Sequence, residues 1–196
     1  MPTIKEFTKV WKNVARSCQN SNRGNIAEFI LTQFKVFLHS KPIADYLSAN
    51  HLSLLNWLQG DIHRWPLQYS RIVESYHVSA LSDYKPNSLF SAAVFTCDVV
   101  WKCITVRAGE CPICGDDLVY YWSDGAQTLV LSCDQCTWMP TADGKFLDYL
   151  NRELDTVEGI LQPPTLSQLQ KRGICGEASK AESRRAKKLS VLSLNP

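Results

Sequence analysis

Residues 111–114 read Cys-Pro-Ile-Cys and residues 133–136 read Cys-Asp-Gln-Cys, and these two stretches decide how the middle of the chain folds. Each stretch is a Cys-x-x-Cys pair, and eighteen residues separate the two pairs. This spacing lies within the range of four-cysteine zinc sites. Two thiolates on one tight turn can point at one ion, and two such turns brought together by a hairpin complete a tetrahedron with Zn–S distances of about 2.3 Å.

The residues between the two pairs predict that hairpin. Residues 118–122 form a run of β-branched and aromatic side chains, Asp124-Gly125 is a strong turn signal, and residues 128–131 lead back to the second pair. Pro112 stiffens the first turn, and Gly115 supplies the backbone freedom needed just after the second ligand. The expected unit is therefore a knuckle, a strand, a turn, a strand and a second knuckle.

The sequence Cys-Pro-Ile-Cys-Gly at residues 111–115 resembles the first knuckle of the zinc-ribbon family, and the resemblance covers about residues 108–146. All four expected ligands are cysteines, so no coordination position is left open for water, which is typical of a structural ion rather than a catalytic one. The alternatives are disulfides or two thioredoxin-like redox motifs, but a redox pair needs only one Cys-x-x-Cys beside a βαβ unit. We therefore expect one structural zinc ion, held by Cys111, Cys114, Cys133 and Cys136.

Composition limits the rest of the chain. With 196 residues, of which 45% are hydrophobic, the chain can build one large domain or two small ones with a real core. The most apolar stretch, residues 89–106, is interrupted by Asp98 and Lys102, so it predicts a buried element and no membrane partner. Eight cysteines without a secretory signal favour a reducing compartment, and we expect a cytoplasmic protein. The cysteines outside the two pairs are expected to be buried thiols: Cys18, Cys97, Cys103 and Cys175.

Helical periodicity dominates the first hundred residues. Capping signals begin helices at Thr3, Asn25 and Asn87 or Ser88, and proline can occupy the first turn at Pro42 and Pro66. The expected helices before the ribbon cover residues 3–18, 25–38, 42 onward, 52–58, 66–76 and 88 to about 101, where the last can give way to a strand. Two more are expected after the ribbon, at residues 144–161 and 165–173.

These elements predict an α+β protein with four parts. The expected parts are a mainly helical N-terminal domain at residues 1–106, a small β zinc ribbon at 107–146, helices packing on the core at 147–175 and a mobile basic tail at 176–196.

Charge is distributed unevenly along the chain. Residues 108–145 contain six acidic residues and one lysine, whereas residues 171–188 contain seven basic residues and two acidic ones. An acidic ribbon repels phosphate but complements a basic protein, and aromatic rings can anchor such an interface. The expected partner-binding residues are Asp116, Asp117, Tyr120, Trp122, Asp124 and Trp138. The alternative for the rings is that they cover the ribbon core or pack on the helices.

These patterns predict a non-enzymatic, zinc-binding interaction protein that binds and neutralises one basic protein, in the manner of bacterial immunity proteins and antitoxins. The alternative is a nucleic-acid- or ribosome-associated factor that uses the basic tail and the helical face. A metal-dependent enzyme is disfavoured by the all-cysteine site. The sequence has no Gly-x-Ser-x-Gly or His-Glu-x-x-His motif, and residues 115–132 contain no histidine for a His-Asn-His nuclease.

Overall fold

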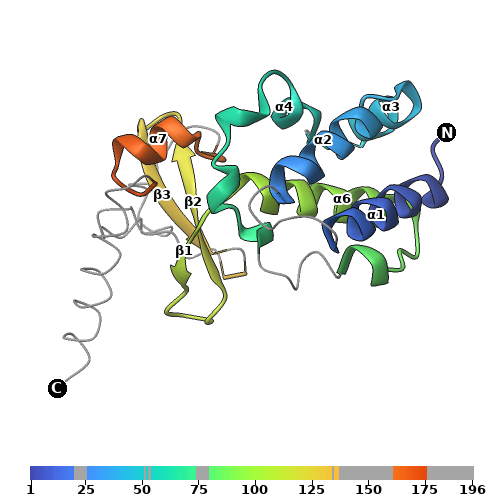
Figure 1. The fold of residues 1–196 in the computed structure, drawn as a ribbon. Coiled ribbons are helices and arrows are strands. Elements are labelled where there is room, and N and C mark those ends of the chain that lie inside the picture. The colour runs from blue at the N-terminus through green and yellow to red at the C-terminus, as the bar shows by residue number, and fades with distance from the viewer. Residues whose placement is uncertain are drawn as a thin grey trace.

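A group of helices is followed along the chain by an antiparallel sheet, and the two lie side by side (Figure 1). The computed structural model describes residues 1–19, 26–50, 52, 54–73, 80–133, 135–136 and 161–175. The expected α+β class is confirmed, with helices up to residue 104 and the first strand beginning at residue 107. None of the helices in these ranges is long and apolar enough to cross a membrane.

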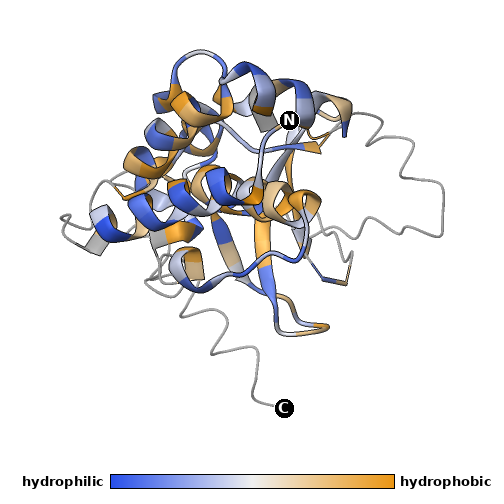
Figure 2. Ribbon diagram, turned by 90° about the vertical axis from the view of Figure 1, so that its right-hand side faces the viewer, coloured by the Kyte–Doolittle hydropathy of each residue, from blue (hydrophilic) through white to orange (hydrophobic). Residues whose placement is uncertain are grey.

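Most of the predicted helices form close to their predicted bounds. The helices include α1 (Ile4–Gln19), α2 (Ile26–Leu38), α3 (Lys41–Ala49), α4 (Leu54–Leu58), α6 (Leu89–Ile104) and α7 (Leu166–Lys171), with 3-10 turns η2 (Ile62–Arg64), η3 (Leu67–Tyr69) and η4 (Arg71–Val73). Hydrophobic and hydrophilic residues alternate along them as expected for helices with one buried side (Figure 2).

Local capping explains where these helices begin. The backbone N–H and the hydroxyl of Thr3 donate to the Glu6 carboxylate at 2.6 and 3.0 Å. At α6 the Ser91 N–H donates to the Ser88 hydroxyl at 3.0 Å, and the Ser88 N–H donates to the Ser91 hydroxyl at 3.2 Å. Each contact satisfies a donor that the first helical turn leaves without a partner. The α6 helix continues to Ile104, so the expectation that it ends near residue 101 is wrong by about one turn.

The main core lies between α1, α2 and α6. Phe7 and Trp11 of α1, Phe34 of α2 and Val100 of α6 are fully buried in one cluster. The buried indole N–H of Trp11 donates to the Thr96 hydroxyl at 3.0 Å. This contact satisfies the one polar atom of the ring, so the largest side chain of the core carries no desolvation penalty from an unpaired donor.

Within the described residues 66–73, the helix predicted at residues 66–76 is not continuous. The chain instead makes two short 3-10 turns, η3 and η4, with an extended residue, Ser70, between them. Ser70 bridges Val106 in antiparallel fashion, and the Arg71 N–H donates to the Thr105 carbonyl at 3.1 Å. These pairings with the chain that leaves α6 satisfy backbone groups that a continuous helix would have used locally, so tertiary contacts override the helical pattern.

The sheet places the expected hairpin beside the helices. Its strands are β1 (Arg107–Glu110), β2 (Asp117–Ser123), β3 (Thr128–Cys133) and β4 (Leu161–Gln162). Every residue of β3 pairs with β2, while β1 pairs with the first part of β2 and β4 with its end. Leu161 was expected to end a helix but lies in β4, opposite Ser123; the rest of that predicted helix, residues 144–160, lies outside the described residues.

The α7 helix covers one side of this sheet. Leu169 of α7 is fully buried in a second cluster with Val106, Leu129 and Cys175. The predicted start of the helix is confirmed, because Thr165 and Gln168 form a reciprocal capping box. α7 therefore packs on the sheet rather than on the main helical core, and the tail at residues 176–196 lies outside the described residues.

A seam of aromatic rings and an ion-pair network joins the helices to the sheet. The rings of Trp57 and Trp101 lie 4.7 Å apart between centroids, and Trp101 lies 5.4 Å from Tyr121 of β2. Beside this seam, Asp117 of β2 accepts from the Arg71 guanidinium at 3.0 Å and from that of Arg107 at 2.6 Å. The side chain of Arg71 is only 5% exposed, so Asp117 compensates a charge that is largely removed from water.

Candidate metal centre

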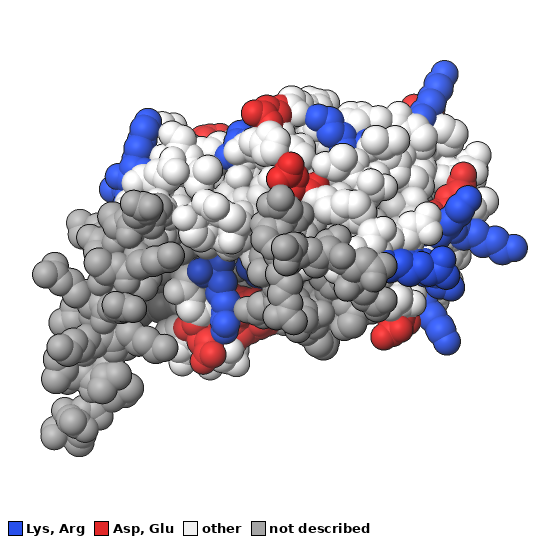
Figure 3. Space-filling view, in the orientation of Figure 1, with Lys and Arg blue, Asp and Glu red and all other residues white. Residues whose placement is uncertain are grey.

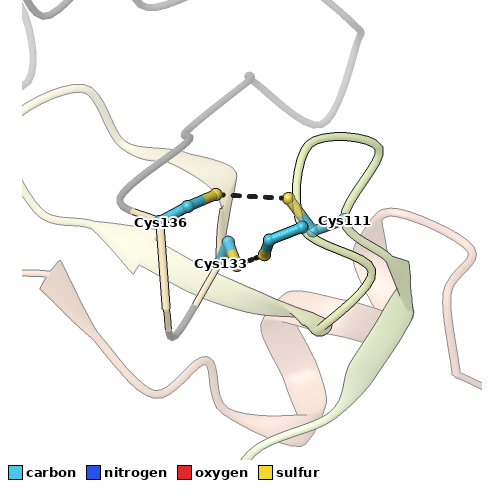
Figure 4. A group of neighbouring side chains, drawn as sticks. Cys111, Cys133 and Cys136 are labelled. Carbon is cyan, nitrogen blue, oxygen red and sulfur yellow. Dashed lines mark hydrogen bonds between the residues drawn. The ribbon is translucent and has the colours of Figure 1, made fainter.

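Four cysteine sulfurs converge at the end of the sheet where the knuckles lie. The ligand atoms of Cys111, Cys114, Cys133 and Cys136 all lie within 4.8 Å of one another. The Sγ–Sγ distance is 3.4 Å between Cys111 and Cys136 and 3.4 Å between Cys114 and Cys133 (Figure 4). A disulfide needs a separation of about 2.05 Å, so none of these contacts is a covalent bond.

These separations fit the size of a tetrahedral metal site. A tetrahedron with metal–sulfur bonds of about 2.3 Å has sulfur–sulfur edges of about 3.8 Å. The observed spread, from 3.4 Å to at most 4.8 Å, brackets that value. The sequence prediction that the two pairs meet is therefore confirmed, and the segment is compatible with a zinc-ribbon-like unit.

The first knuckle is shaped by its backbone. The Cys111 N–H donates to the Asp116 carbonyl at 2.7 Å, and the Gly115 N–H donates to the Cys111 carbonyl at 2.8 Å. Gly115 has a φ of +77°, a left-handed conformation that glycine adopts without steric cost, as its place after the second ligand predicted. This closed loop turns the sulfurs of Cys111 and Cys114 toward the same point.

Backbone N–H groups also face the sulfurs. The Gln135 N–H donates to the Cys133 Sγ at 3.4 Å in the second knuckle. In the first knuckle, burial acts to raise the pKa of Cys111, but backbone N–H groups of Cys114 and Ile113 and the neighbouring thiols lower it to about 7. The backbone N–H of Asp116 acts to lower the pKa of Cys114, but the Cys133 thiol, burial and the two other thiols together raise it to about 12. Four thiols this close cannot all ionise unless a cation lies among them.

Very little apolar surface supports this end of the sheet. Its buried cluster consists of Cys111, Cys133 and Leu118, with Ala108 and Cys136 packed against it. Two of these three buried residues, Cys111 and Cys133, also belong to the group of four converging sulfurs. Among the described residues, the knuckles therefore have little apolar packing apart from the sulfur cluster.

The other four cysteines lie elsewhere. None of Cys18, Cys97, Cys103 and Cys175 belongs to the group of converging ligands in the described part of the chain. Burial raises the pKa of Cys97 to about 12 and that of Cys175 to about 11, and it raises the pKa of Cys103 well above its usual value. These thiols stay protonated at neutral pH and pack as small apolar side chains.

The acidic residues expected to bind a partner have different surroundings. Asp117 lies between Arg71 and Arg107, so its charge is already compensated inside the molecule. A carboxylate oxygen of Asp116 accepts from the Asp117 N–H at 2.7 Å. Asp124 is exposed at the opposite end of β2 and accepts from the side-chain amide of Gln162. The structure therefore does not gather the three carboxylates into one patch.

The expected aromatic anchors pack against the protein. Tyr120 and Trp122 are partly buried against the cluster around Leu169 of α7, and burial raises the pKa of Tyr120. Their neighbour Tyr121 points to the other side of the strand and meets Trp101 of α6. Packing of the rings against the rest of the protein is the alternative to partner binding given in the sequence analysis. Trp138 lies outside the described residues.

Sequence reasoning missed three residues at this end of the sheet. Arg71 and Arg107 had no visible link to Asp117, because only the fold brings residues 71 and 117 together. Ile113, at the tip of the first knuckle, is 67% exposed. The exposure of Ile113 could have been predicted from the sequence, since both x positions of a Cys-x-x-Cys turn point away from the ion.

No protein-family model matches the chain, and neither a curated protein nor a solved structure is significantly similar to it.

Proposed function

We propose that the chain is a non-enzymatic interaction protein whose sulfur cluster holds one structural zinc ion and whose first knuckle contacts a basic protein partner. The observation that carries the metal assignment is the set of four cysteine sulfurs with tetrahedral separations. Thiolate ligands in a tetrahedron select zinc or an iron–sulfur centre, and the Cys-x-x-Cys spacing favours zinc. With every ligand position filled by sulfur, the ion has no site for substrate.

The surface around the first knuckle supports the interaction role. Ile113 is exposed at its tip, and Glu110, which precedes the knuckle and pairs with Arg107 at 3.3 Å, has a side chain that is 73% exposed. Asp116 lies on the same turn, and the ion with four thiolates adds a net charge of about −2. We call Glu110, Ile113 and Asp116 the knuckle face; acidic residues gather near the lower end of the sheet in Figure 3.

An apolar residue within an acidic rim is the arrangement that favours a basic protein. Interfaces place apolar groups at the centre and charges at the edge, where the charges steer encounter and reject partners of the wrong sign. Of the acidic residues expected from the sequence, Asp116 belongs to this face, while Asp117 is compensated and Asp124 lies at the far end of β2. Blocking a basic surface of the partner would neutralise it, as immunity proteins and antitoxins do.

The test compares a knuckle variant with a matched control. Glu110→Lys/Ile113→Ser changes one charge and one exposed apolar residue on the knuckle face. Asp45→Lys/Val36→Ser makes the same two changes on the helices, where Asp45 is exposed and Val36 is 77% exposed. Metal-loaded forms of both are used to capture partners from nuclease-treated native lysate, after elemental analysis for zinc.

The expected result is a basic protein captured by the unmodified chain and the control but not by the knuckle variant. Equal capture by both variants would show that the knuckle face is not the interface. The metal assignment would be refuted if the unmodified protein carried no zinc. It would also be refuted if Cys114→Ser bound zinc as well as the unmodified protein does.

A further inference from the structure

We propose that the outer face of α1 binds the phosphate backbone of nucleic acid without reading its sequence. This inference goes beyond the proposed function and concerns the other end of the molecule, since α1 lies among the helices on the right of Figure 1 and the sheet lies on the left. It starts from the pattern of α1, whose apolar residues Phe7, Trp11, Val14 and Cys18 are buried in the core.

The opposite face of α1 carries a row of cations. Lys5, Lys9, Lys12 and Arg16 are all exposed and follow each other at intervals of four, three and four residues. Residues at these intervals share one face of a helix, and the row extends for about 16 Å along it. We call these four residues the α1 basic row. Lys and Arg side chains gather on the same side of the molecule in Figure 3.

The first three lysines of the row are uncompensated. In the described part of the chain, Lys5, Lys9 and Lys12 make no ion pair, whereas Lys102 pairs with Asp98 and Arg107 pairs with Glu110 and Asp117. Glu6, the one acidic residue of α1, is engaged by Thr3. Like charges four residues apart destabilise a helix, so the row has a cost in stability that the buried face of α1 offsets.

A hollow lies along the same face. Its volume is about 460 Å³, and the described residues that line it all belong to α1. Besides the row, they include the Thr8 hydroxyl, the Asn13 amide and Ile4. Lysine, arginine, threonine and asparagine are the side chains that most often contact phosphate oxygens, so the hollow offers both charge and neutral hydrogen-bonding groups to a phosphate chain.

Nucleic acid fits this surface better than other anionic partners do. A membrane-binding helix must insert its apolar face into lipid, but here that face forms the protein core. An acidic protein would need aromatic or aliphatic anchors among the charges, and Ile4 is partly buried. A straight row of cations suits a regularly charged polymer, whose binding is driven by release of counterions.

The experiment measures binding of the full-length, zinc-loaded chain to a short labelled RNA duplex by fluorescence anisotropy over a range of salt concentrations. The row variant is Lys5→Ala/Lys9→Ala/Lys12→Ala, and its control, Lys41→Ala/Lys102→Ala/Lys171→Ala, removes three cations elsewhere. Circular dichroism and melting establish that both variants fold. A third variant, with Arg184, Arg185, Lys187 and Lys188 changed to alanine, separates the α1 row from the basic tail.

The expected result is salt-dependent binding that weakens in the row variant, with the slope of log K against log salt falling by about 0.9 for each phosphate that the variant no longer neutralises. The control and the tail variant should retain most of the affinity, and a second duplex of unrelated sequence should bind equally. Equal losses in row variant and control, or a loss confined to the tail variant, would overturn the inference. So would preferential binding to anionic vesicles. The knuckle variant should bind RNA normally, so failure of either proposal leaves the other intact.

Discussion

The helical region and the knuckle end of the sheet are stabilised in opposite ways. The helical core buries large side chains such as Phe7, Trp11 and Phe34 completely. At the knuckle end, the buried cluster contains Leu118 and two cysteines of the candidate metal site. Burial of apolar area contributes about 25 cal/mol per Å², and the helical core buries much more of it than the described residues of the knuckle end do. Four converging cysteine sulfurs lie there in place of a larger apolar cluster.

The largest effect that tests this contrast is loss of the ion. Zinc binding to a structural site can supply about 10–16 kcal/mol of apparent free energy at neutral pH. We therefore expect Cys114→Ser to lose zinc and to unfold the knuckles, while α1, α2 and α6 keep their structure. Elemental analysis and amide hydrogen exchange of residues 107–133 measure the two consequences.

Cys97→Ala is the control for that loss, because Cys97 lies outside the sulfur cluster. It should leave one zinc ion per chain. Zinc retained by Cys114→Ser, or lost from Cys97→Ala, would contradict the assigned ligands. Uniform loss of protection across the helices would show that the two regions are not separately stabilised.

In the helical region, Trp11→Ala is expected to cost about 3–5 kcal/mol of unfolding free energy. The substitution leaves a large cavity and removes the donor that the buried Thr96 hydroxyl accepts from. Urea denaturation of the zinc-loaded protein measures the loss, with Val36→Ala at an exposed site of α2 as the control. A cost below about 1 kcal/mol for Trp11→Ala would show that this core is not what stabilises the helices.

The junction between the regions is expected to show an effect of about 3 kcal/mol. Asp117→Ala removes a carboxylate that lies 3.0 Å from the buried Arg71 guanidinium, and removing one partner of a buried ion pair is costly. Glu110→Ala removes a carboxylate from an exposed pair with Arg107 and should cost less than about 1 kcal/mol. Thermal melting compares the two. Equal destabilisation would mean that burial of Arg71 does not strengthen the pair.

The smallest effect concerns a helix terminus. Ser88→Ala removes the side-chain acceptor for the Ser91 N–H at the start of α6 and should cost about 1 kcal/mol. Ser82→Ala, at an exposed position outside a capping box, is the comparison. If the two variants had the same denaturant midpoint, the capping box at Ser88 would not contribute to stability.

The sequence predicted those features of the fold that depend on contacts between residues close together in the chain. The helix starts at Ser88 and Thr165, and the meeting of the two cysteine pairs, depend on residues three or four apart or on one hairpin. The sequence did not predict the two 3-10 turns at residues 67–73, because Ser70 and Arg71 pair with a segment more than thirty residues away. For the same reason the extended Leu161 was mistaken for helix, since β2 supplies its backbone partners.

Charge was the least predictable property of the site. Counting carboxylates along residues 108–145 gave one acidic surface, but the count ignored the arginine that η4 brings to Asp117. Aromatic residues on neighbouring positions of β2 likewise face opposite sides, so Tyr121 meets α6 while Tyr120 and Trp122 meet the α7 cluster. A surface depends on which side chains the fold leaves unpaired, and composition alone does not contain that information.

The aromatic seam gives the protein an optical signal of its own. Trp57 and Trp101 lie 4.7 Å apart at an interplanar angle of 45°, and chromophores so close and so inclined couple their electronic transitions. Because Trp101 also touches Tyr121 of β2, movement of the sheet relative to α6 would change the surroundings of Trp101. Near-ultraviolet circular dichroism can therefore follow the docking of the two regions during metal loading without an added label.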